Sequence, residues 1–184
     1  MLFEDKLHDI IDTLEADKML LLPIGFAWAV VYRDLHTLLE HWSQDQYHLL
    51  DSYIFMLVLD LPALKSHHPQ LHPRVETLLH YHRRPLGIVS DEYDGKLVRQ
   101  FEVAHCIAFD PFAHRIVQLL GSPICCSYIS YQGRLVRDYC NITASVSRKA
   151  SYIANRHRSQ TLSGIRPKVA KYDYHGNLIF AEAE

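Results

Sequence analysis

The sequence lacks the short motifs by which common nucleotide-binding and hydrolytic sites are recognised. It contains no G-x-G-x-x-G, no Walker A motif and no G-x-S-x-G. A dinucleotide-binding loop, a P-loop and a nucleophile elbow need those residues, because their glycines permit tight turns around a phosphate or a serine. A C-x-x-C pair is absent too, which disfavours the usual zinc-ribbon and thiol-redox sites.

Long hydrophobic runs are also missing. Runs such as Met19–Pro23 and Ile54–Leu59 are far shorter than the roughly 20 apolar residues that a membrane-spanning helix needs. The first 18 residues are acidic and amphipathic and do not have the basic and apolar regions of a secretion signal. We therefore expect a cytoplasmic protein without a membrane contact. Its 184 residues, 48% hydrophobic and 22% charged, suit a single globular domain over 1–184.

The four cysteines do not form a disulfide framework. Cys125 and Cys126 are adjacent, and adjacent cysteines rarely pair in such a framework. We expect buried free thiols. A cysteine nucleophile at Cys125 or Cys126 is the alternative, but no neighbouring residue in the sequence supplies a base.

Histidine is abundant, with 13 residues, but its spacing does not favour a metal site. Five of them crowd one region: His67, His68, His72, His80 and His82. On the helix expected there, His80 and His82 face different directions, so we expect surface and loop histidines and no metal. The acidic turn at Asp91, Glu92 and Asp94 is interpreted as a solvated loop.

Positive charge is unevenly distributed. No Lys or Arg occurs between Asp34 and Leu64, whereas the C-terminal third is basic although the net charge is -2. Its basic residues are Arg134, Arg137, Arg148, Lys149, Arg156, Arg158, Arg166, Lys168 and Lys171. They either contact a polyanion such as RNA or form a solvated face that balances the acidic half.

Alternating helical and strand patterns predict an α/β protein with a twisted mixed sheet, flanking helices and a single domain. Helices are expected at Leu2–Asp17, Asp34–Tyr47, near Pro62, at Arg74–His82, Pro111–Leu120 and, with a weak pattern, Asn141–Lys149. Strands are expected at Met19–Leu22, Phe26–Tyr32, Tyr53–Asp60, Leu86–Ser90, Val103–Phe109, Pro123–Ser130, Tyr152–Asn155, Val169–Tyr172 and Leu178–Phe180.

The stretch Met19–Tyr32 is the most site-like part of the chain. It reads as two buried strands around a turn at Pro23–Gly25, and turns between buried elements are where α/β proteins tend to bind ligands. Yet the turn carries no Ser, Thr, Asp, Lys or His.

The order of several segments resembles the YrdC-like family of threonylcarbamoyl-adenylate synthases, which act in tRNA modification. The segments are LLLP before the first turn, Arg84-Pro85-Leu86 before a strand, Phe112 in the helix that leads to Gly121-Ser-Pro-Ile, and the closing hairpin at Gly176. The resemblance covers about Leu7 to Phe180. It implies a twisted mixed sheet around a concave, positively lined cleft in which active members bind ATP, threonine and bicarbonate and release pyrophosphate.

The family's functional residues are largely absent from the matching positions. The P-T-D-T turn falls on Pro23, Ile24, Gly25 and Phe26, and the Lys-x-Arg pair falls near Tyr47 to Leu49, where no basic residue exists. The strand arginine falls on Ala108, and the late Pro-Ser-Ser/Thr falls on Arg166, Pro167 and Lys168. The S-T-S-A-N segment falls on Cys126, Ser127, Tyr128, Ile129 and Ser130.

We therefore predict a divergent, catalytically degenerate YrdC-like domain that uses no cofactor and acts as a binding or interaction module, for a protein partner or a second copy of the chain, or holds a different small ligand. The cleft is expected to be lined by Pro23, Ile24, Gly25, Phe26, Arg84, Ala108, Cys126, Ser127, Tyr128 and Ser130, and refilled by Ile24, Phe26, Tyr128 and Tyr131. One alternative is an active synthase that uses ATP and Mg²⁺, with Arg156, Arg158, Arg166 or Lys168 in the cleft. The other is an RNA-binding module that uses the same basic residues.

Overall fold

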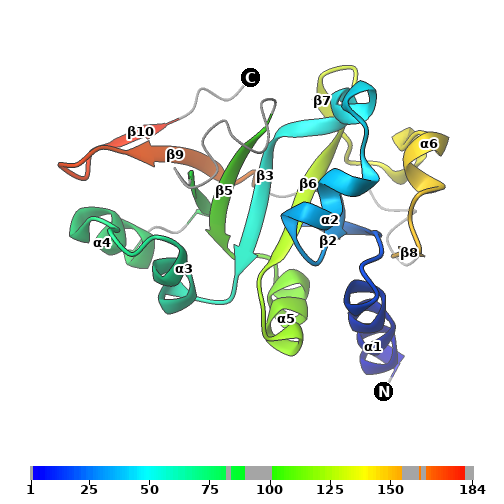
Figure 1. The fold of residues 1–184 in the computed structure, drawn as a ribbon, viewed down its shortest axis with the longest axis horizontal. Helices are drawn as coiled ribbons and strands as arrows, with labels where there is room; N and C mark the ends of the chain where they lie inside the picture. Colours follow the sequence, from blue (N-terminus) through cyan, green and yellow to red (C-terminus); the bar gives the residue numbers. More distant parts are fainter. Residues whose placement is uncertain (1, 82–83, 90–100, 155–161, 163–164, 181–184) are drawn as a thin grey trace.

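The fold is built on a ten-stranded mixed sheet that is flanked by helices (Figure 1). The protein is represented by a computed structural model that describes residues 2–81, 84–89, 101–154, 162 and 165–180. The strand order is β10-β9-β4-β5-β3-β6-β2-β1-β8, with β7 paired to β6. The pairs β3–β5, β4–β9 and β1–β8 are parallel and the other pairs are antiparallel. The mixed α/β fold and the single domain predicted from the sequence are confirmed.

The elements have the following bounds. The strands are β1 Leu20–Ile24, β2 Ala27–Tyr32, β3 Leu50–Val58, β4 Leu86–Val89, β5 Glu102–Ile107, β6 Ile124–Tyr131, β7 Arg134–Leu135, β8 Tyr152–Ile153, β9 Lys168–Tyr172 and β10 Leu178–Phe180. The helices are α1 Leu2–Glu15, α2 Leu35–His41, α3 Leu61–His67, α4 Pro73–Tyr81, α5 Pro111–Leu120 and α6 Ala144–Ser147, with 3₁₀ turns η1 Gln44–Leu49 and η3 Tyr139–Asn141.

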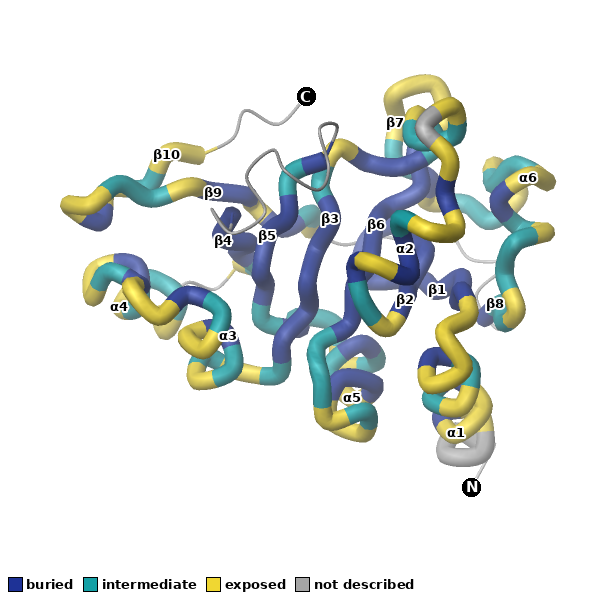
Figure 2. The backbone as a smooth tube through the Cα atoms, viewed as in Figure 1, coloured by how far each residue is buried: buried dark blue, intermediate teal, exposed yellow. Residues whose placement is uncertain are grey.

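The central strands are buried along most of their length, which explains their continuous apolar sequences (Figure 2). In the antiparallel register of β2 and β6, Val30 lies opposite Ser127 and Val31 opposite Cys126. β3 pairs on its other side with β5, so Ile54 lies between Ser127 and Val103. A sheet buried on both faces in this way places its functional groups at strand ends and turns.

Three helices begin at an aspartate whose side chain accepts a backbone N–H of the first turn. Asp34 caps α2 through Thr37, Asp60 caps α3 through Ala63, and Asp110 caps α5. Proline follows in the first turn of α3 and α5, where its missing N–H costs no hydrogen bond. Gly121 ends α5 in the left-handed conformation, with φ 69°.

Several expected boundaries differ from the structure, and two of the differences have a clear physical reason. Pro23 belongs to β1 and lies opposite Trp28 in the β1–β2 ladder, so the turn is Gly25–Phe26 and not Pro23–Gly25. The helix expected over Asp34–Tyr47 stops at His41, because Trp42 is extended. There its buried indole N–H donates to the Tyr32 hydroxyl at 2.8 Å, so a tertiary contact overrides local helix propensity.

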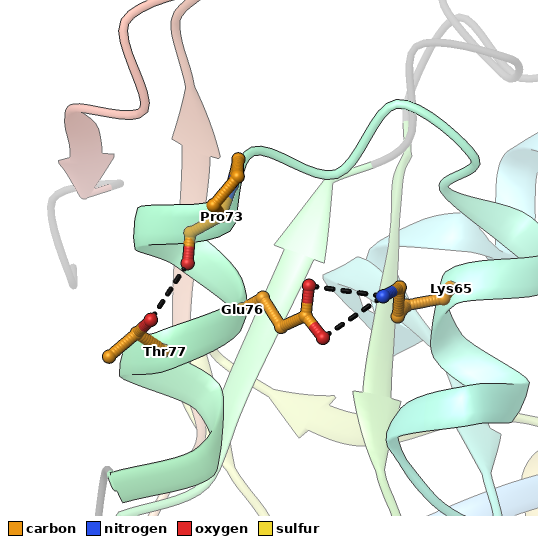
Figure 3. A network of polar contacts seen from close by, with 4 residues as sticks. All are labelled: Lys65, Pro73, Glu76 and Thr77. Atoms are coloured by element: carbon orange, nitrogen blue, oxygen red, sulfur yellow. Dashed lines mark hydrogen bonds and ion pairs between the residues drawn. The ribbon is translucent and has the colours of Figure 1, made fainter.

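A smaller apolar cluster lies beside the main core, where α3 and α4 cover the end of the sheet. Its members are Val58, Leu64, Leu71, Val75, Leu86, Ile88 and Ala170. An ion pair joins the two helices on the outside, with Lys65 Nζ 2.9 and 3.0 Å from the carboxylate oxygens of Glu76 (Figure 3). Such an exposed pair contributes at most about 1 kcal/mol, so apolar packing holds α3 and α4 in place.

No helix in the described ranges combines the length and the apolarity that a bilayer crossing requires.

Candidate functional site

Two cavities lie on either side of the Gly25–Phe26 turn. The small pocket, of about 420 Å³, has Gly25, Leu79, Arg84, Pro85, Leu86, Ile107, Ala108, Phe109, Asp110, Pro111 and Ile165 in its wall. The arginine groove, of about 1550 Å³, is lined by Phe26, Leu50, Asp51, Ser52, Tyr53, Ser130, Tyr131, Gln132, Gly133, Arg134, Leu135, Val136, Arg137, Asp138, Asn141 and Arg166. Ile165 lines the small pocket and its neighbour Arg166 lines the arginine groove, so the two cavities also meet at this point of the chain.

The turn is held in place by a single carboxylate. Gly25 has φ 63°, a conformation that suits glycine at the first central position of a two-residue hairpin. Its N–H donates to Asp110 Oδ2 at 3.3 Å, while Asp110 Oδ1 accepts the N–H groups of Phe112 and Ala113 at 3.0 Å. The N-terminus of α5 therefore fixes the position of the turn between the two cavities.

An aromatic column begins at the turn and continues into the core. The ring of Phe26 lies 4.6 Å from that of Tyr128, which lies 5.6 Å from Phe55. All three side chains are buried, and burial raises the pKa of the Tyr128 hydroxyl well above its ordinary value. Where the resemblance expects a ligand-binding hydroxyl, Phe26 supplies packing.

The structure places the predicted site residues in several different parts of the fold. Gly25, Arg84 and Ala108 line the small pocket, and Phe26, Ser130 and Arg166 line the arginine groove. Buried in the sheet are Pro23, Ile24, Cys126, Ser127 and Tyr128. Lys168 lies at the far edge, 5.3 Å above the Phe180 ring. Arg156, Arg158 and the acidic turn Asp91–Gly95 lie outside the described residues.

The arginine groove combines three guanidinium groups with one closely bound carboxylate. Arg134, in β7, and Arg137 are exposed on its wall. Arg166 donates from Nη2 to Asp51 Oδ1 at 3.1 Å and to Oδ2 at 2.9 Å. Burial raises the pKa of Asp51, and the neighbouring Arg166 acts in the opposite direction. The exposed guanidinium groups of Arg134 and Arg137 can therefore hold an anionic group in the groove.

Asp51 and Asp110 were not identified as site residues from the sequence. Asp110 carried a local signal, because an aspartate directly before a proline is a common way to begin a helix. Asp51 carried only a weak one, as an isolated acid at the start of an apolar strand. Its partner Arg166 is 115 positions away, a separation at which no local pattern exists.

The thiols and histidines offer little additional chemistry. Cys106, Cys125 and Cys126 are buried, as expected, but Cys140 is exposed. Burial raises the pKa of Cys106 to about 12 and that of Cys126 further, which disfavours a reactive thiolate. The expectation of surface and loop histidines is wrong for His68, which is buried. In the part of the chain that the structure describes, no three His, Cys, Asp or Glu side chains are grouped to hold a metal ion.

Comparison with known proteins gives matches only at the level of structure. No model of a known protein family matches the chain, and no curated protein matches its sequence. E. coli YciO superimposes with a TM-score of 0.70 at 13% identity, over 96% of this chain and 88% of YciO. P. abyssi Sua5 complexed with L-threonine gives 0.66 at 14% identity over 91% of this chain. Full-length HypF in its phosphate- and nucleotide-bound form gives 0.66 at 14% identity over 95% of this chain.

The chain spans about half of Sua5 and 28% of HypF, so it corresponds to one part of each of those proteins. YciO, by contrast, is covered over 88% of its length, so the similarity extends over most of both chains. The strand order and the helices described above are thus those of a known architecture. The chain has the YrdC-like fold that it shares with YciO and Sua5, and at 13–14% identity it is a divergent example of that fold.

Proposed function

We propose that this protein is a YrdC-like binding module whose arginine groove takes an anionic ligand and that it does not form an acyl-adenylate. The observation that carries the proposal is the groove itself, with Arg134, Arg137 and Arg166 in the wall next to Phe26. Among the described residues, neither Arg134 nor Arg137 forms an ion pair, so both guanidinium groups are available to a ligand. Guanidinium groups bind phosphate and carboxylate oxygens through paired N–H donors.

The ligands of one similar structure support an anion of this kind. HypF has been solved in a phosphate- and nucleotide-bound form, whereas the ligand of Sua5, L-threonine, is a zwitterion. ATP fits this chain only in part. The arginines suit its phosphates, whereas Phe26, Ala108 and Tyr128 replace the hydroxyl and cationic groups that the resemblance places beside nucleotide and threonine.

The loss of those hydroxyl and cationic groups argues against synthesis of an acyl-adenylate by this protein. A hydrogen bond to a charged group contributes about 1.5–3 kcal/mol. Three or four such losses amount to roughly 5–10 kcal/mol of ligand or transition-state binding, a factor on the order of 10³–10⁷. Arg166 does not restore them as it stands, because its guanidinium is bound to Asp51.

Isothermal titration with inorganic pyrophosphate and with ATP tests binding. We expect saturable binding that weakens at least tenfold, or about 1.4 kcal/mol, in Arg134→Ala/Arg137→Ala. Arg115→Ala/Arg148→Ala removes the same charge from residues outside both cavities and serves as the matched control. Equal loss in both double variants, or no binding by the wild type, contradicts the proposal.

A pyrophosphate-release assay with ATP, threonine and bicarbonate tests the enzyme alternative. Threonine-dependent release by the wild type, lost in Arg134→Ala/Arg137→Ala, would establish an active synthase and overturn the non-catalytic proposal. No turnover above the buffer blank is the expected result.

RNA binding by the basic C-terminal third is less well supported. Lys168 and Lys171 lie on β9 near one end of the sheet, while Arg148 and Lys149 lie beside β8 at the other. Lys171 pairs with Glu102 at 2.7 Å, and Lys149 donates to the carbonyl of His41. Filter binding at low salt would reveal RNA retention, and its decline with ionic strength would measure the phosphate contacts.

A second copy of the chain is the other expected partner. Sedimentation at several protein concentrations tests whether the chain forms a homodimer.

A further inference from the structure

A buried carboxylate lies in the wall of the arginine groove and is bound to one of its arginines. The side chain of Asp51, near the start of β3, is 8% exposed, and both of its oxygens lie within hydrogen-bonding distance of Arg166 Nη2. Arg166 lies two residues before β9, and β5 and β4 separate β9 from β3 in the sheet. The contact is therefore tertiary, and it supplies the opposite charge that a buried carboxylate needs.

Asp51 also lies close to the part of the groove where we expect the ligand. Its neighbour Leu50 in β3 and Leu135 in β7 lie opposite successive residues of β6. β3 and β7 thus flank β6 on its two sides, and two such strands are about 10 Å apart. Because Arg134 belongs to β7 and lines the same groove, an anion on its guanidinium group lies within electrostatic reach of Asp51.

Other charged and titratable side chains share the groove with this carboxylate. They are Arg166 before β9, Tyr128 and Tyr131 of β6, Arg134 of β7, Arg137, Asp138 and Tyr53 of β3. Glu102 of β5 pairs instead with Lys171. Asp45 and His48 of η1 are exposed to solvent. Since Arg166 is the cation in direct contact with the carboxylate, the charge balance there depends chiefly on that one contact.

An anion that enters the groove changes the surroundings of Asp51 in one direction. An anion that takes over Arg166 removes the opposite charge beside the carboxylate. An anion held only by Arg134 and Arg137 repels the carboxylate through its own charge. Both effects favour the neutral form of Asp51. Burial already raises the pKa of Asp51 against the opposing influence of Arg166, so a bound anion raises that pKa further.

We propose that anion binding in the arginine groove is coupled to the uptake of one proton from solvent by Asp51, so that the groove binds its ligand more tightly as the pH falls. This inference rests on the proposed anion-binding function and names the regulation of that site. The ionised carboxylate weakens the binding of any anion, and its protonation leaves Arg166 to the ligand. Because linkage is reciprocal, the ligand promotes protonation as much as protonation promotes binding.

Isothermal titration with inorganic pyrophosphate at pH 5, 6 and 7 tests the coupling. Buffers that differ in ionisation enthalpy give the number of protons taken up with each ligand. Pyrophosphate itself titrates in this range, and Asp51→Asn, whose amide does not titrate, measures that contribution. At one or more of these pH values the wild type should take up at least about 0.3 proton more than Asp51→Asn. Its affinity relative to Asp51→Asn should rise about fivefold or more from pH 7 to pH 5.

Asp138→Asn is the matched control, because it removes a less buried carboxylate from the same groove wall. Its proton uptake should equal that of the wild type. Asp51→Ser replaces Asp51→Asn if circular dichroism shows that the latter does not fold.

Three results would contradict this coupling. Equal proton uptake by the wild type and Asp51→Asn, with pyrophosphate bound by both, would overturn the inference and leave the proposed function intact. The same loss of uptake in Asp138→Asn as in Asp51→Asn would reduce the effect to net charge and would also overturn the inference. Absence of pyrophosphate binding by the wild type and by Asp51→Asn at every pH would remove the proposed function as well.

Discussion

The backbone N–H of Gly25 donates to the carboxylate of Asp110, 85 residues along the chain. The same carboxylate caps α5 through Phe112 and Ala113. One side chain thus fixes both a helix N-terminus and the turn that separates the small pocket from the arginine groove. The shape of the candidate site depends on this contact, although the contact itself takes no part in ligand chemistry.

Replacement of Asp110 by alanine should cost more stability than loss of an ordinary helix cap. A cap is worth about 0.5–2 kcal/mol, and Asp110→Ala loses the bond to Gly25 in addition. Asp60→Ala is the matched control, because Asp60 caps α3 through Ala63 and is the N-cap of that helix alone. Urea unfolding should place Asp110→Ala about 1 kcal/mol below Asp60→Ala. Equal losses would mean that the Gly25 contact contributes nothing.

Alanine at position 25 meets two obstacles. The residue has φ 63°, and a Cβ there would lie 2.7 Å from Cε2 of Phe109. Gly121 has a similar φ of 69° but has nothing within 4 Å of such a Cβ. Gly121→Ala therefore measures the cost of the backbone conformation, about 1–2 kcal/mol, and Gly25→Ala adds the clash. Thermal unfolding should show the larger loss for Gly25→Ala; a smaller loss would mean that Phe109 moves freely out of the way.

Sequence patterns predict the central strands and helices of the fold, but they miss element boundaries that depend on tertiary contacts. Apolar runs with β-branched residues predict the central strands, and the spacing of apolar residues predicts α1 and α5 correctly. Trp42 shows where such inference ends, because its extended backbone depends on a hydrogen bond to Tyr32 that no local pattern contains. The strand boundary at Pro23 depends likewise on pairing with β2.

The candidate site is less predictable than the fold for a related reason. Motif positions identify Gly25, Phe26 and Arg166, since they follow the order of the chain. Burial then assigns Cys126, Ser127 and Tyr128 to the core, and this follows only from how β2, β3 and β6 pair. Asp51 gains its role from a partner 115 residues away, so a three-dimensional arrangement is required to recognise it.

Thiol reactivity should separate Cys140 from the other cysteines. Cys140 is exposed, whereas burial keeps Cys106, Cys125 and Cys126 protonated and inaccessible. A chromogenic disulfide reagent at pH 8 should modify one thiol rapidly in the native protein and all four in denaturant. Cys140→Ser should remove the rapid phase. A second thiol that reacts equally fast would show that part of the sheet opens.

Acid should destabilise the protein through His105, and the sign follows from its environment. His105 is fully buried in β5, with the ring of His67 stacked at 4.6 Å and His68 Nε2 3.1 Å from its Nδ1. Burial, together with these two histidines, lowers the pKa of His105 from 6.5 to about 3. Between pH 6.5 and about 3 the unfolded chain therefore binds a proton at His105, whereas the folded chain does not. Stability from this group is present above pH 6.5 and is lost progressively as the pH falls toward 3.

At pH 5 the loss from His105 amounts to about 2 kcal/mol relative to pH 7.5. His105→Gln should lower stability at neutral pH but flatten the pH dependence by that amount, because glutamine does not titrate. His8→Gln, at an exposed position on α1, should leave the pH profile of the wild type unchanged. Urea unfolding at pH 7.5, 6 and 5 measures all three proteins. Parallel profiles for His105→Gln and the wild type would show that His105 takes up its proton in the folded state, in conflict with the buried histidine cluster between α3 and β5.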